Sequence, residues 1–448
     1  MKRSSLFILI FLGIGMGSAE SAESVYHEPE GLVRGGAFID RFLPVPLRGK
    51  LRSDVWGAAN VVPRDVNNGI EDAEYSYWGG NIIAGDDGKN HLFVCRWPED
   101  NVKGGGKASG HHTWWSSEVV HAVSDDPLGP YKVVDTIGKG HNPEIYQTAA
   151  GTWYIGVMGK KAYRAESLEG PWEQVVSTFD RTDVPKHWHE NRTYVAREDG
   201  SVLAMCKAGT LWLSEKGDEN FHLLTEESAY TRPPQGHYED PVIWRDEVQY
   251  HLVYNDWYGR VAYYKRSPDG IHWTTEPGIA FTPEIMKHEG GTQEKWYKFE
   301  RPKVRQDQYG RATHMNFAVI DVIKDNDLAN DNHSSKNIVI PLVVPRRLQI
   351  LNTEPITAGT KKIRVRILAE DGFDPVEEVD LKSLTFGAPK AVDFGRGFTT
   401  LKSETAGKDL IVTFAGSAHE ITADNFAAKL IGRTKSGALL FGYAKLSN

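Results

Sequence analysis

The sequence predicts an all-β protein, made of a five-bladed β-propeller followed by a small C-terminal β-sandwich. Two short motifs that recur in phase predict the propeller, and alternating apolar runs near the end of the chain predict the second domain. The composition agrees, because 11% aromatic residues, 13 Trp and 44 Gly are typical of many short strands joined by tight turns.

The first motif is clearest over residues 237–244, which a polar turn joins to a second apolar stretch over 248–254. β-branched and aromatic residues fill both stretches and charged residues fill the turn, a pattern typical of a β-hairpin. Glu239 and Asp240 open the first strand, just before Pro241. An ionised carboxylate is costly to bury and Pro has no N–H to donate, so this opening indicates the mouth of a pocket.

Four further copies of this hairpin occur in the chain. They open at residues 78, 141, 190 and 300, which gives a spacing of roughly 50 to 60 residues between neighbouring copies. That period favours four-stranded propeller blades over helical repeats, which are shorter and have a 3.6-residue periodicity. The first strands of five blades are therefore expected near residues 80, 143, 192, 241 and 302.

The second motif follows the hairpins at residues 124–131, 167–172 and 267–273. Each copy combines Ser, acidic residues, Gly and Pro with an aromatic residue at its end. It is interpreted as the tight turn between the outer strands of a blade.

The first 19 residues predict a signal peptide: Lys2 and Arg3 precede an apolar run over 6–17, and a small-residue cleavage site ends at Ala19. We therefore expect a secreted or periplasmic protein, with an uncleaved N-terminal anchor as the alternative. No later apolar run reaches 18 residues, so no membrane contact is expected once the signal is removed. The net charge of −8 is diffuse and there is no basic patch, which argues against nucleic acid as a partner.

The rest of the chain divides into three segments. Residues 20–77 lack the repeat and form a lead-in that either wraps the ring, the favoured interpretation, or reaches the pocket. Residues 78–349 form the propeller, and residues 350–448 form the β-sandwich, which offers no catalytic constellation.

A polar insertion over 325–336 is expected to be a solvated loop. Cys95 and Cys206 lie in blades that are not neighbours, so two buried free thiols are expected.

The two motifs together resemble the five-bladed β-propeller glycoside hydrolases of family 43 and its wider, clan F-like relatives, over roughly residues 78 to 345. The resemblance implies a pocket on the propeller axis, a base Asp in the first blade, a further Asp in the third and an acid Glu in the fourth. Glu239 matches the acid. The third-blade position carries Glu190-Asn191, shifted by one residue, and the first-blade position is Gly79 or Gly80 instead of Asp.

Glu190, Glu239 and Glu300 hold the same place in three successive blades and are expected to share one face of the ring, with Asp240 beside them. Glycosidic cleavage needs one carboxyl that is protonated and one that is ionised, and neighbouring acids separate their pKa values. These four residues are the candidate catalytic carboxylates. The alternative is that the three glutamates pair with Arg192, Arg232 or Arg301 as ties between blades.

The missing base is expected from the lead-in, with Glu74 or Asp54 favoured over Asp65 and Asp72. A set of polar and aromatic residues near the strand openings is expected to bind substrate, because it offers hydrogen-bond partners for sugar hydroxyls and rings for stacking. The candidate substrate-binding residues are His141, Asn142, His189, Arg192, His237, Arg301, Trp78, Glu74 and Asp54.

The resemblance implies no required cofactor. It does imply that an axial Ca²⁺ can be present near a fifth-blade His, for which His314 is the nearest match, and the sequence leaves the metal open. The function expected is an exported glycoside hydrolase acting on plant or algal polysaccharide or its oligosaccharides. A carbohydrate-binding propeller without catalysis and a family-130-like phosphorylase are the alternatives, although export argues against the latter because its sugar phosphate would be lost outside the cell. The oligomeric state stays open.

Overall fold

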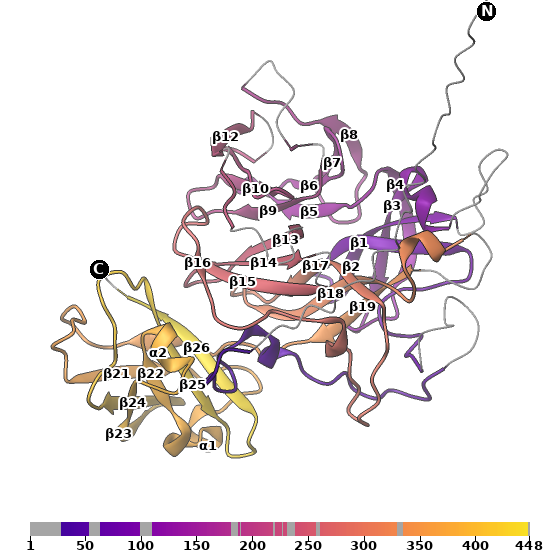
Figure 1. The fold of residues 1–448 in the computed structure, drawn as a ribbon. Helices are drawn as coiled ribbons and strands as arrows, with labels where there is room; N and C mark the ends of the chain where they lie inside the picture. Colours follow the sequence, from indigo (N-terminus) through magenta and orange to yellow (C-terminus); the bar gives the residue numbers. More distant parts are fainter. Residues whose placement is uncertain are drawn as a thin grey trace, which may run out of the picture.

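The computed structural model describes residues 28–52, 63–98, 110–180, 187–188, 190–217, 220–225, 227–230, 238–256, 260–328 and 335–446 (Figure 1). Five antiparallel sheets each follow the order of the chain, and their first strands contact one another in a closed circle: β1 with β5, β5 with β9, β9 with β13, β13 with β17 and β17 with β1. The predicted five-bladed propeller is therefore confirmed, with first strands where the repeat predicts them. The predicted signal peptide lies outside the described residues.

In each blade the strands follow the chain from the axis outward. The first blade contains β1 (Tyr75–Ala84), β2 (Asn90–Pro98), β3 (Glu118–Ser124) and β4 (Lys132–Lys139), and the second contains β5 (Glu144–Gln147), β6 (Trp153–Gly156), β7 (Lys161–Ala165) and β8 (Glu173–Val176). The third blade contains β9 (Arg192–Ala196), β10 (Val202–Cys206), β11 (Leu211–Ser214) and β12 (His222–Thr225), and the fourth contains β13 (Tyr238–Arg245), β14 (Tyr250–Asp256), β15 (Val261–Ser267) and β16 (Thr274–Thr275). The fifth blade contains β17 (Lys298–Gln306), β18 (Ala312–Ile320) and β19 (Ser335–Pro341). Four short 3₁₀ helices lie before or between them: η1 (Phe38–Arg41), η2 (His111–Ser116), η3 (Pro283–Ile285) and η4 (Lys324–Asn326).

Burial follows position within a blade. The second strands β10 and β14 are buried along their whole length, which explains the continuous apolar run of β10, whereas the outer strand β4 is mostly exposed. Cys95 and Cys206 are both buried free thiols in separate hydrophobic clusters, as predicted.

The lead-in runs along the fifth blade, whose own sheet has three strands. Ile70 forms an antiparallel bridge with Asn337 on β19, and the Asn68 side chain imitates a peptide group there. Its Oδ1 accepts from the Val339 N–H at 2.7 Å and its Nδ2 donates to the Val339 carbonyl at 2.8 Å. Gly69 between them has φ 69°, and a Cβ at this position would lie 1.9 Å from the Asn337 oxygen, so only glycine fits. The start of the chain thus adds to the last blade and closes the ring.

The C-terminal domain is also built from strands, as predicted. A single seven-stranded sheet has the order β20 (Leu348–Ile350), β21 (Lys362–Ile367), β24 (Asp409–Ala415), β23 (Phe398–Ala406), β22 (Thr385–Gly387), β25 (Ala427–Arg433) and β26 (Leu439–Lys445). Short helical turns α1 (Pro375–Glu378), η5 (Leu381–Ser383) and α2 (Pro389–Val392) lie between its strands. The edge strands β20 and β26 contact each other, so the sheet curls almost to closure and its opposite walls pack face to face, as the two layers of a sandwich do.

Residues 32–41 join the two domains. The Val33 N–H donates to the Asp393 carbonyl, and Lys429 donates to the Gly35 carbonyl. Arg41 donates to the Tyr443 hydroxyl at 3.2 Å while its guanidinium lies over aromatic rings of both domains.

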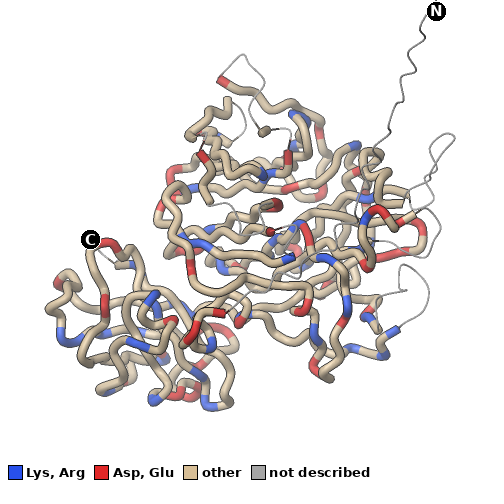
Figure 2. The backbone as a smooth tube through the Cα atoms, viewed as in Figure 1, with Lys and Arg blue, Asp and Glu red and all other residues tan. Residues whose placement is uncertain are grey.

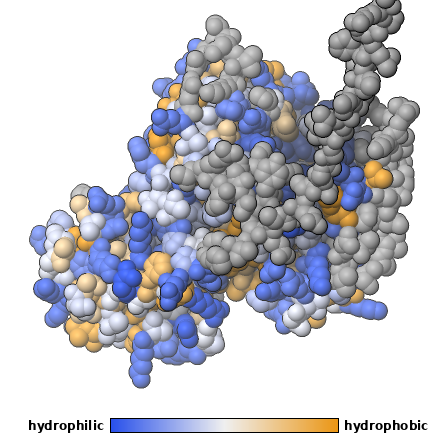
Figure 3. Space-filling view, in the orientation of Figure 1, coloured by the Kyte–Doolittle hydropathy of each residue, from blue (hydrophilic) through white to orange (hydrophobic). Residues whose placement is uncertain are grey.

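Charged and apolar residues are both dispersed over the described residues in the view of Figures 2 and 3. Basic and acidic residues alternate along both domains in Figure 2, without a large region of one sign. On the face shown in Figure 3 the apolar side chains form only small separate groups. Within the described part of the chain, no helix is both long and apolar enough to cross a membrane.

Candidate active site

One residue at the opening of each inner strand faces the propeller axis. Four of them share a left-handed backbone, with φ 61° at Gly79, 53° at Asn142, 52° at Asp240 and 50° at Arg301, and Asn191 holds the same place in the third blade. In blades one, four and five a β-bulge coincides with this position. Because a bulge re-aims the side chains beside it, these five residues meet across the axis, and together they form the axial ring.

Hydrogen bonds run around the axial ring from blade to blade. Asn142 Nδ2 donates to Asn191 Oδ1 at 2.6 Å, and Asn191 Nδ2 donates to Asp240 Oδ1 at 2.8 Å. Arg301 donates to both Asp240 oxygens, from its backbone N–H at 2.9 Å and from Nη1 at 3.0 Å. The fifth position of the ring is Gly79, which packs closely against Asn142. A Cβ at Gly79 would lie 3.1 Å from Asn142 Oδ1.

Both oxygens of Asp240 therefore accept hydrogen bonds within the axial ring. Burial raises the pKa of its carboxyl, but the Arg301 guanidinium and backbone N–H outweigh burial and hold the pKa below its usual range. Arg301 thus ties blades four and five through Asp240 and not through one of the three glutamates, and this geometry leaves Asp240 the role of a fixed negative charge.

The residue just before each ring position forms a second set of five: Trp78, His141, Glu190, Glu239 and Glu300. The three glutamates occupy equivalent places in adjacent blades. The Glu300 charge raises the pKa of Glu239, and Asn191, the residue after Glu190, places its Nδ2 3.4 Å from Glu239 Oε1. The structure thus brings together the three glutamates that the repeat aligned.

Glu239 lies at the opening of β13, with its side chain 17% exposed. Its Oε1 accepts a hydrogen bond from Lys207 Nζ at 2.8 Å. Burial raises the pKa of Glu239, the nearby charges of Asp240 and Glu300 raise it further, and Lys207 opposes the shift without reversing it. Glu239 holds its proton more tightly than a free glutamate does.

Glu300 has the opposite environment. It is 3% exposed and pairs with two ammonium groups, Lys298 on its own strand and Lys324 of η4 at 2.6 Å. Burial would raise the pKa of Glu300, but Lys324 and Lys298 lower it below the usual value. Burial in turn lowers the pKa of Lys298 to about 8. Glu300 is held ionised.

Glu190 is the most accessible of the three glutamates, with 26% of its side chain exposed. His187 Nδ1 lies 3.1 Å from its Oε1. Lys207, whose N–H donates to the Asn191 carbonyl, interacts electrostatically with both Glu190 and Glu239. Among the predicted residues nearby, His189 and His237 lie outside the described residues.

The predicted histidine and aromatic contacts are largely internal. His141 is half-buried, bonds Ser117 Oγ at 2.9 Å and packs 4.7 Å from the half-buried Trp114 ring. Burial, with Arg301 and Lys324, lowers the pKa of His141 well below its usual value, so it is neutral near neutral pH. Trp78 is 2% exposed and Lys324 Nζ lies 4.8 Å from its ring centre, so its ring is covered rather than open to a sugar.

Two other predicted substrate-binding residues lie elsewhere. Arg192 is buried and donates to the Trp188 and Val157 carbonyls and to the Tyr194 hydroxyl at 2.8 Å, which makes it a tie between blades two and three. The prediction that it contacts substrate does not fit this position. Glu74 is exposed ahead of β1 and takes no part in the contacts of the site described above, and Asp54 lies outside the described residues.

Three lysines, Lys207, Lys298 and Lys324, were not predicted. Lys298 and Glu300 are two residues apart on one strand, so the two-residue periodicity of a strand could have indicated their contact. Lys324 precedes the polar insertion that was expected to be plain solvated loop, and Lys207 follows β10 without any motif.

The axis does not suit the calcium ion that the resemblance allows. The ring position is filled by a guanidinium and two amides around one carboxylate, while Ca²⁺ requires six to eight oxygen ligands. His314 lies beside Arg305, and burial together with that positive charge lowers its pKa to about 4. A guanidinium, from Arg301 or from Arg305, therefore lies at both places.

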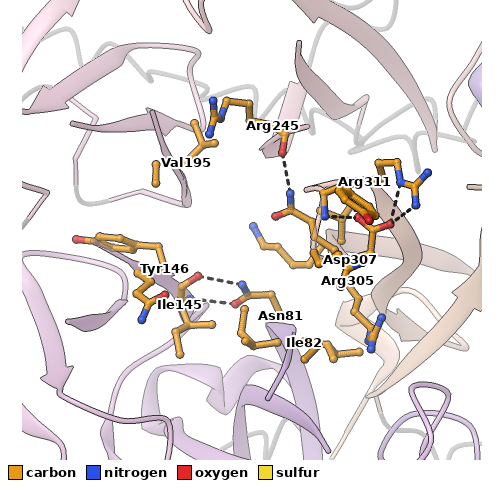
Figure 4. Close-up of a pocket in the computed structure, with 18 of the residues that line it drawn as sticks. Asn81, Ile82, Ile145, Tyr146, Val195, Arg245, Arg305, Asp307 and Arg311 are labelled. Carbon is orange, nitrogen blue, oxygen red and sulfur yellow. Dashed lines mark hydrogen bonds and ion pairs between the residues drawn. The ribbon is translucent and has the colours of Figure 1, made fainter. Parts of the chain in front are cut away.

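A large cavity of about 1210 Å³ opens at the other end of the axis, where the inner strands finish (Figure 4). Residues 369–371 of the C-terminal domain also line it. The Asn81 amide holds the Ile145 backbone there through two hydrogen bonds of 2.9 and 3.0 Å. Its buried or half-buried acids are neutralised: Asp307 and Glu370 both pair with Arg311, and Glu144 pairs with Lys303. The three aligned glutamates do not line this cavity, so the strand openings are the better site for acid–base chemistry.

No protein-family model matches the chain, and no curated protein matches its sequence. Solved structures with a similar arrangement of strands include Zg3597, a family 117 glycoside hydrolase from the marine bacterium Zobellia galactanivorans, at 11% identity and a TM-score of 0.46, over 67% of this chain and 90% of that chain. They also include fructan 1-exohydrolase IIa from Cichorium intybus, at 10% identity and a TM-score of 0.42, over 85% and 91%. A third is the GH43 BlXynB protein from Bacillus licheniformis, at 12% identity and a TM-score of 0.38, over 62% and 55%. The predicted resemblance is confirmed at the level of the five-bladed fold, which the sheet order of this chain itself establishes.

Proposed function

We propose that this chain is a glycoside hydrolase in which Glu239 is the general acid. The observation that carries the proposal is the opposite environment of two aligned glutamates: the pKa of Glu239 is raised and the pKa of Glu300 is lowered. Hydrolysis of a glycosidic bond needs one protonated and one ionised carboxyl, and pairs whose surroundings separate their pKa values mark such sites.

The different exposure of Glu239 and Glu300 also distinguishes their proposed roles. Glu239 is partly exposed and can reach the oxygen of a leaving group, whereas Glu300 is buried between two ammonium groups. Glu300 and Asp240 therefore act on Glu239 through their charges. Both are ionised, and both raise its pKa.

Glu190 is assigned as the general base. It is the most exposed of the three glutamates, it lies in the neighbouring blade, and His187 bonds one of its oxygens and so orients the carboxylate toward an incoming water. The lead-in carboxylates fit less well, because Glu74 is exposed outside the site contacts. Asp54 stays a prediction.

The substrate class proposed is plant or algal polysaccharide or its oligosaccharides, and the protein is proposed to act after export, in keeping with its N-terminal sequence. One observation favours the phosphorylase alternative: Lys207, Lys298 and Lys324 place three ammonium groups around the glutamates. All three are engaged with Glu239 or Glu300, so we assign them to charge balance instead.

The experiment that tests the proposal is a reducing-sugar assay of the full mature chain on a panel of plant and algal glycans, with and without inorganic phosphate. Glu239→Gln is the test variant, and Glu215→Gln, an exposed glutamate after β11 in the preceding blade, is the matched control. We expect phosphate-independent release by the wild type and the control, and almost none by Glu239→Gln. Calorimetric binding of a glycan that no form cleaves would instead support the binding propeller, and strict phosphate dependence would support the phosphorylase.

A further inference from the structure

Two carboxylates and one imidazole, side chains of the types that bind metal ions, lie close together at the end of the propeller opposite the glutamates. Asp87 lies in the turn between β1 and β2, His91 lies near the start of β2, and Glu169 lies in the turn between β7 and β8 of the next blade. A nitrogen of His91 and one oxygen of each carboxylate all lie within 4.8 Å of one another. Within the described residues this is the one such group.

His91 is fixed in place by a second histidine. The ring is 2% exposed, its Nδ1 lies 2.9 Å from His121 Nε2, and its Nε2 faces Asp87 Oδ1 at 3.1 Å. The His121 ring stacks on Phe93 with centres 4.6 Å apart, so it has little freedom to move. A metal-binding His typically bonds through its other ring nitrogen to an acceptor, which sets its tautomer and its orientation.

His121 is suited to be that acceptor. His121 Nε2 lies 2.9 Å from His91 Nδ1 and accepts its proton in one of the two tautomers. In that tautomer the lone pair of His91 Nε2 is directed at Asp87 Oδ1, 3.1 Å away, where a metal ion would contact both atoms. In the other tautomer His91 Nε2 donates its proton to Asp87 Oδ1, so a metal ion would take the place of that proton.

The backbone passes close to His91 Nε2 and Asp87 Oδ1 at residue 85. A Cβ at residue 85 would lie 2.5 Å from His91 Nε2 and 2.6 Å from Asp87 Oδ1, and the residue is Gly85. Asp87 and Glu169 are both exposed, so their side chains can close by rotation from the present separation to ligand distances of about 2.0–2.2 Å.

We propose that Asp87, His91 and Glu169 form a binding site for a divalent transition metal ion such as Zn²⁺, which ties blade one to blade two. One imidazole and two carboxylates are ligands that Zn²⁺ accepts, and water completes the coordination. The site is separate from the proposed catalytic glutamates and does not depend on their function.

The test is calorimetric titration of the untagged, chelator-treated full mature chain with ZnCl₂, together with its melting temperature. We expect one equivalent to bind and to raise the melting temperature, because an ion that binds only the folded chain stabilises it. Binding is lost in Asp87→Asn and Glu169→Gln, which change exposed side chains and keep the fold, and it is retained in the control Glu166→Gln, an exposed acid before the same turn.

Substitution with Co²⁺ gives a second readout, since the visible bands of bound Co²⁺ report nitrogen and oxygen ligands directly. The bands are expected in the wild type and in Glu166→Gln, and absent in Asp87→Asn. No binding to the wild type, or equal binding to Asp87→Asn and Glu169→Gln, overturns the proposal.

Discussion

Arg301 holds the Asp240 carboxylate by two hydrogen bonds, one from its backbone N–H at 2.9 Å and one from its guanidinium at 3.0 Å. Both residues are 1% exposed and come from adjacent blades. The left-handed backbone at both positions turns these side chains toward the axis. The pair fixes one negative charge directly beside Glu239, so the geometry of the ring and the acidity of the site are linked.

Breaking this pair should cost stability. Asp240→Asn leaves the Arg301 charge buried without its counterion, and removing one partner of a buried ion pair typically costs about 3–5 kcal/mol. Urea unfolding of Asp240→Asn, Arg301→Met and the double variant measures the effect. The double variant should be less destabilised than the sum of the single variants, and strict additivity would contradict the pairing.

Asn68 attaches the lead-in to the fifth blade through the Val339 backbone. Asn68→Ala leaves the N–H and carbonyl of Val339 unpaired in the interior, and each buried unpaired group costs about 1–3 kcal/mol, so a loss of about 2–6 kcal/mol is expected. Chemical denaturation measures it, with Asn67→Ala, an exposed neighbour, as the control. Equal stability of the two variants would mean that the lead-in does not hold the fifth blade.

Lys207 should set the alkaline limit of activity. Glu239 must be protonated to act, so activity falls as the pH rises through its pKa, which burial, Asp240 and Glu300 raise and Lys207 lowers. Removing the ammonium group in Lys207→Met raises the pKa of Glu239, and the alkaline limb of kcat/KM against pH should move to higher pH. Lys216→Met, at an exposed turn, should leave the limb in place. A limb that does not move in Lys207→Met assigns it to another group.

Glu190 is tested by chemical rescue. Glu190→Ala removes the proposed base, and turnover should fall by about 10²–10⁴-fold, the usual contribution of acid–base catalysis. Sodium azide is a small nucleophile that needs no base, so it should restore turnover with formation of a glycosyl azide. Unchanged activity of Glu190→Ala would move the base to another carboxylate.

The repeat made the architecture predictable from sequence. Hydrogen bonds of the axial ring join residues 49 apart in Asn142–Asn191 and Asn191–Asp240, and 61 apart in Asp240–Arg301, which is the spacing of the motif itself. Aligned positions in successive blades become neighbours on the axis, so the alignment of the three glutamates translated directly into proximity.

The roles within the site could not be predicted in the same way. Asp240 and Glu239 are adjacent in sequence, but the bulge turns one into the ring and leaves the other at the opening, a difference of backbone that sequence does not display. Lys324 lowers the pKa of Glu300 and Lys207 limits the rise in the pKa of Glu239, and both lysines lie outside the two motifs. Their contacts with the glutamates depend on loops from other strands.

The central claim, that Glu239 is the general acid, is tested most directly by comparing Glu239→Gln with the wild type on two substrates of the same sugar. Gln keeps the shape and removes the titrating proton, so turnover of the unactivated glycoside should fall by about 10²–10⁴-fold. An aryl glycoside with a good leaving group needs little protonation and should lose far less, while substrate binding and melting temperature change little. Equal losses on both substrates, or an unfolded variant, would contradict the claim and make Glu239 a structural partner of Lys207.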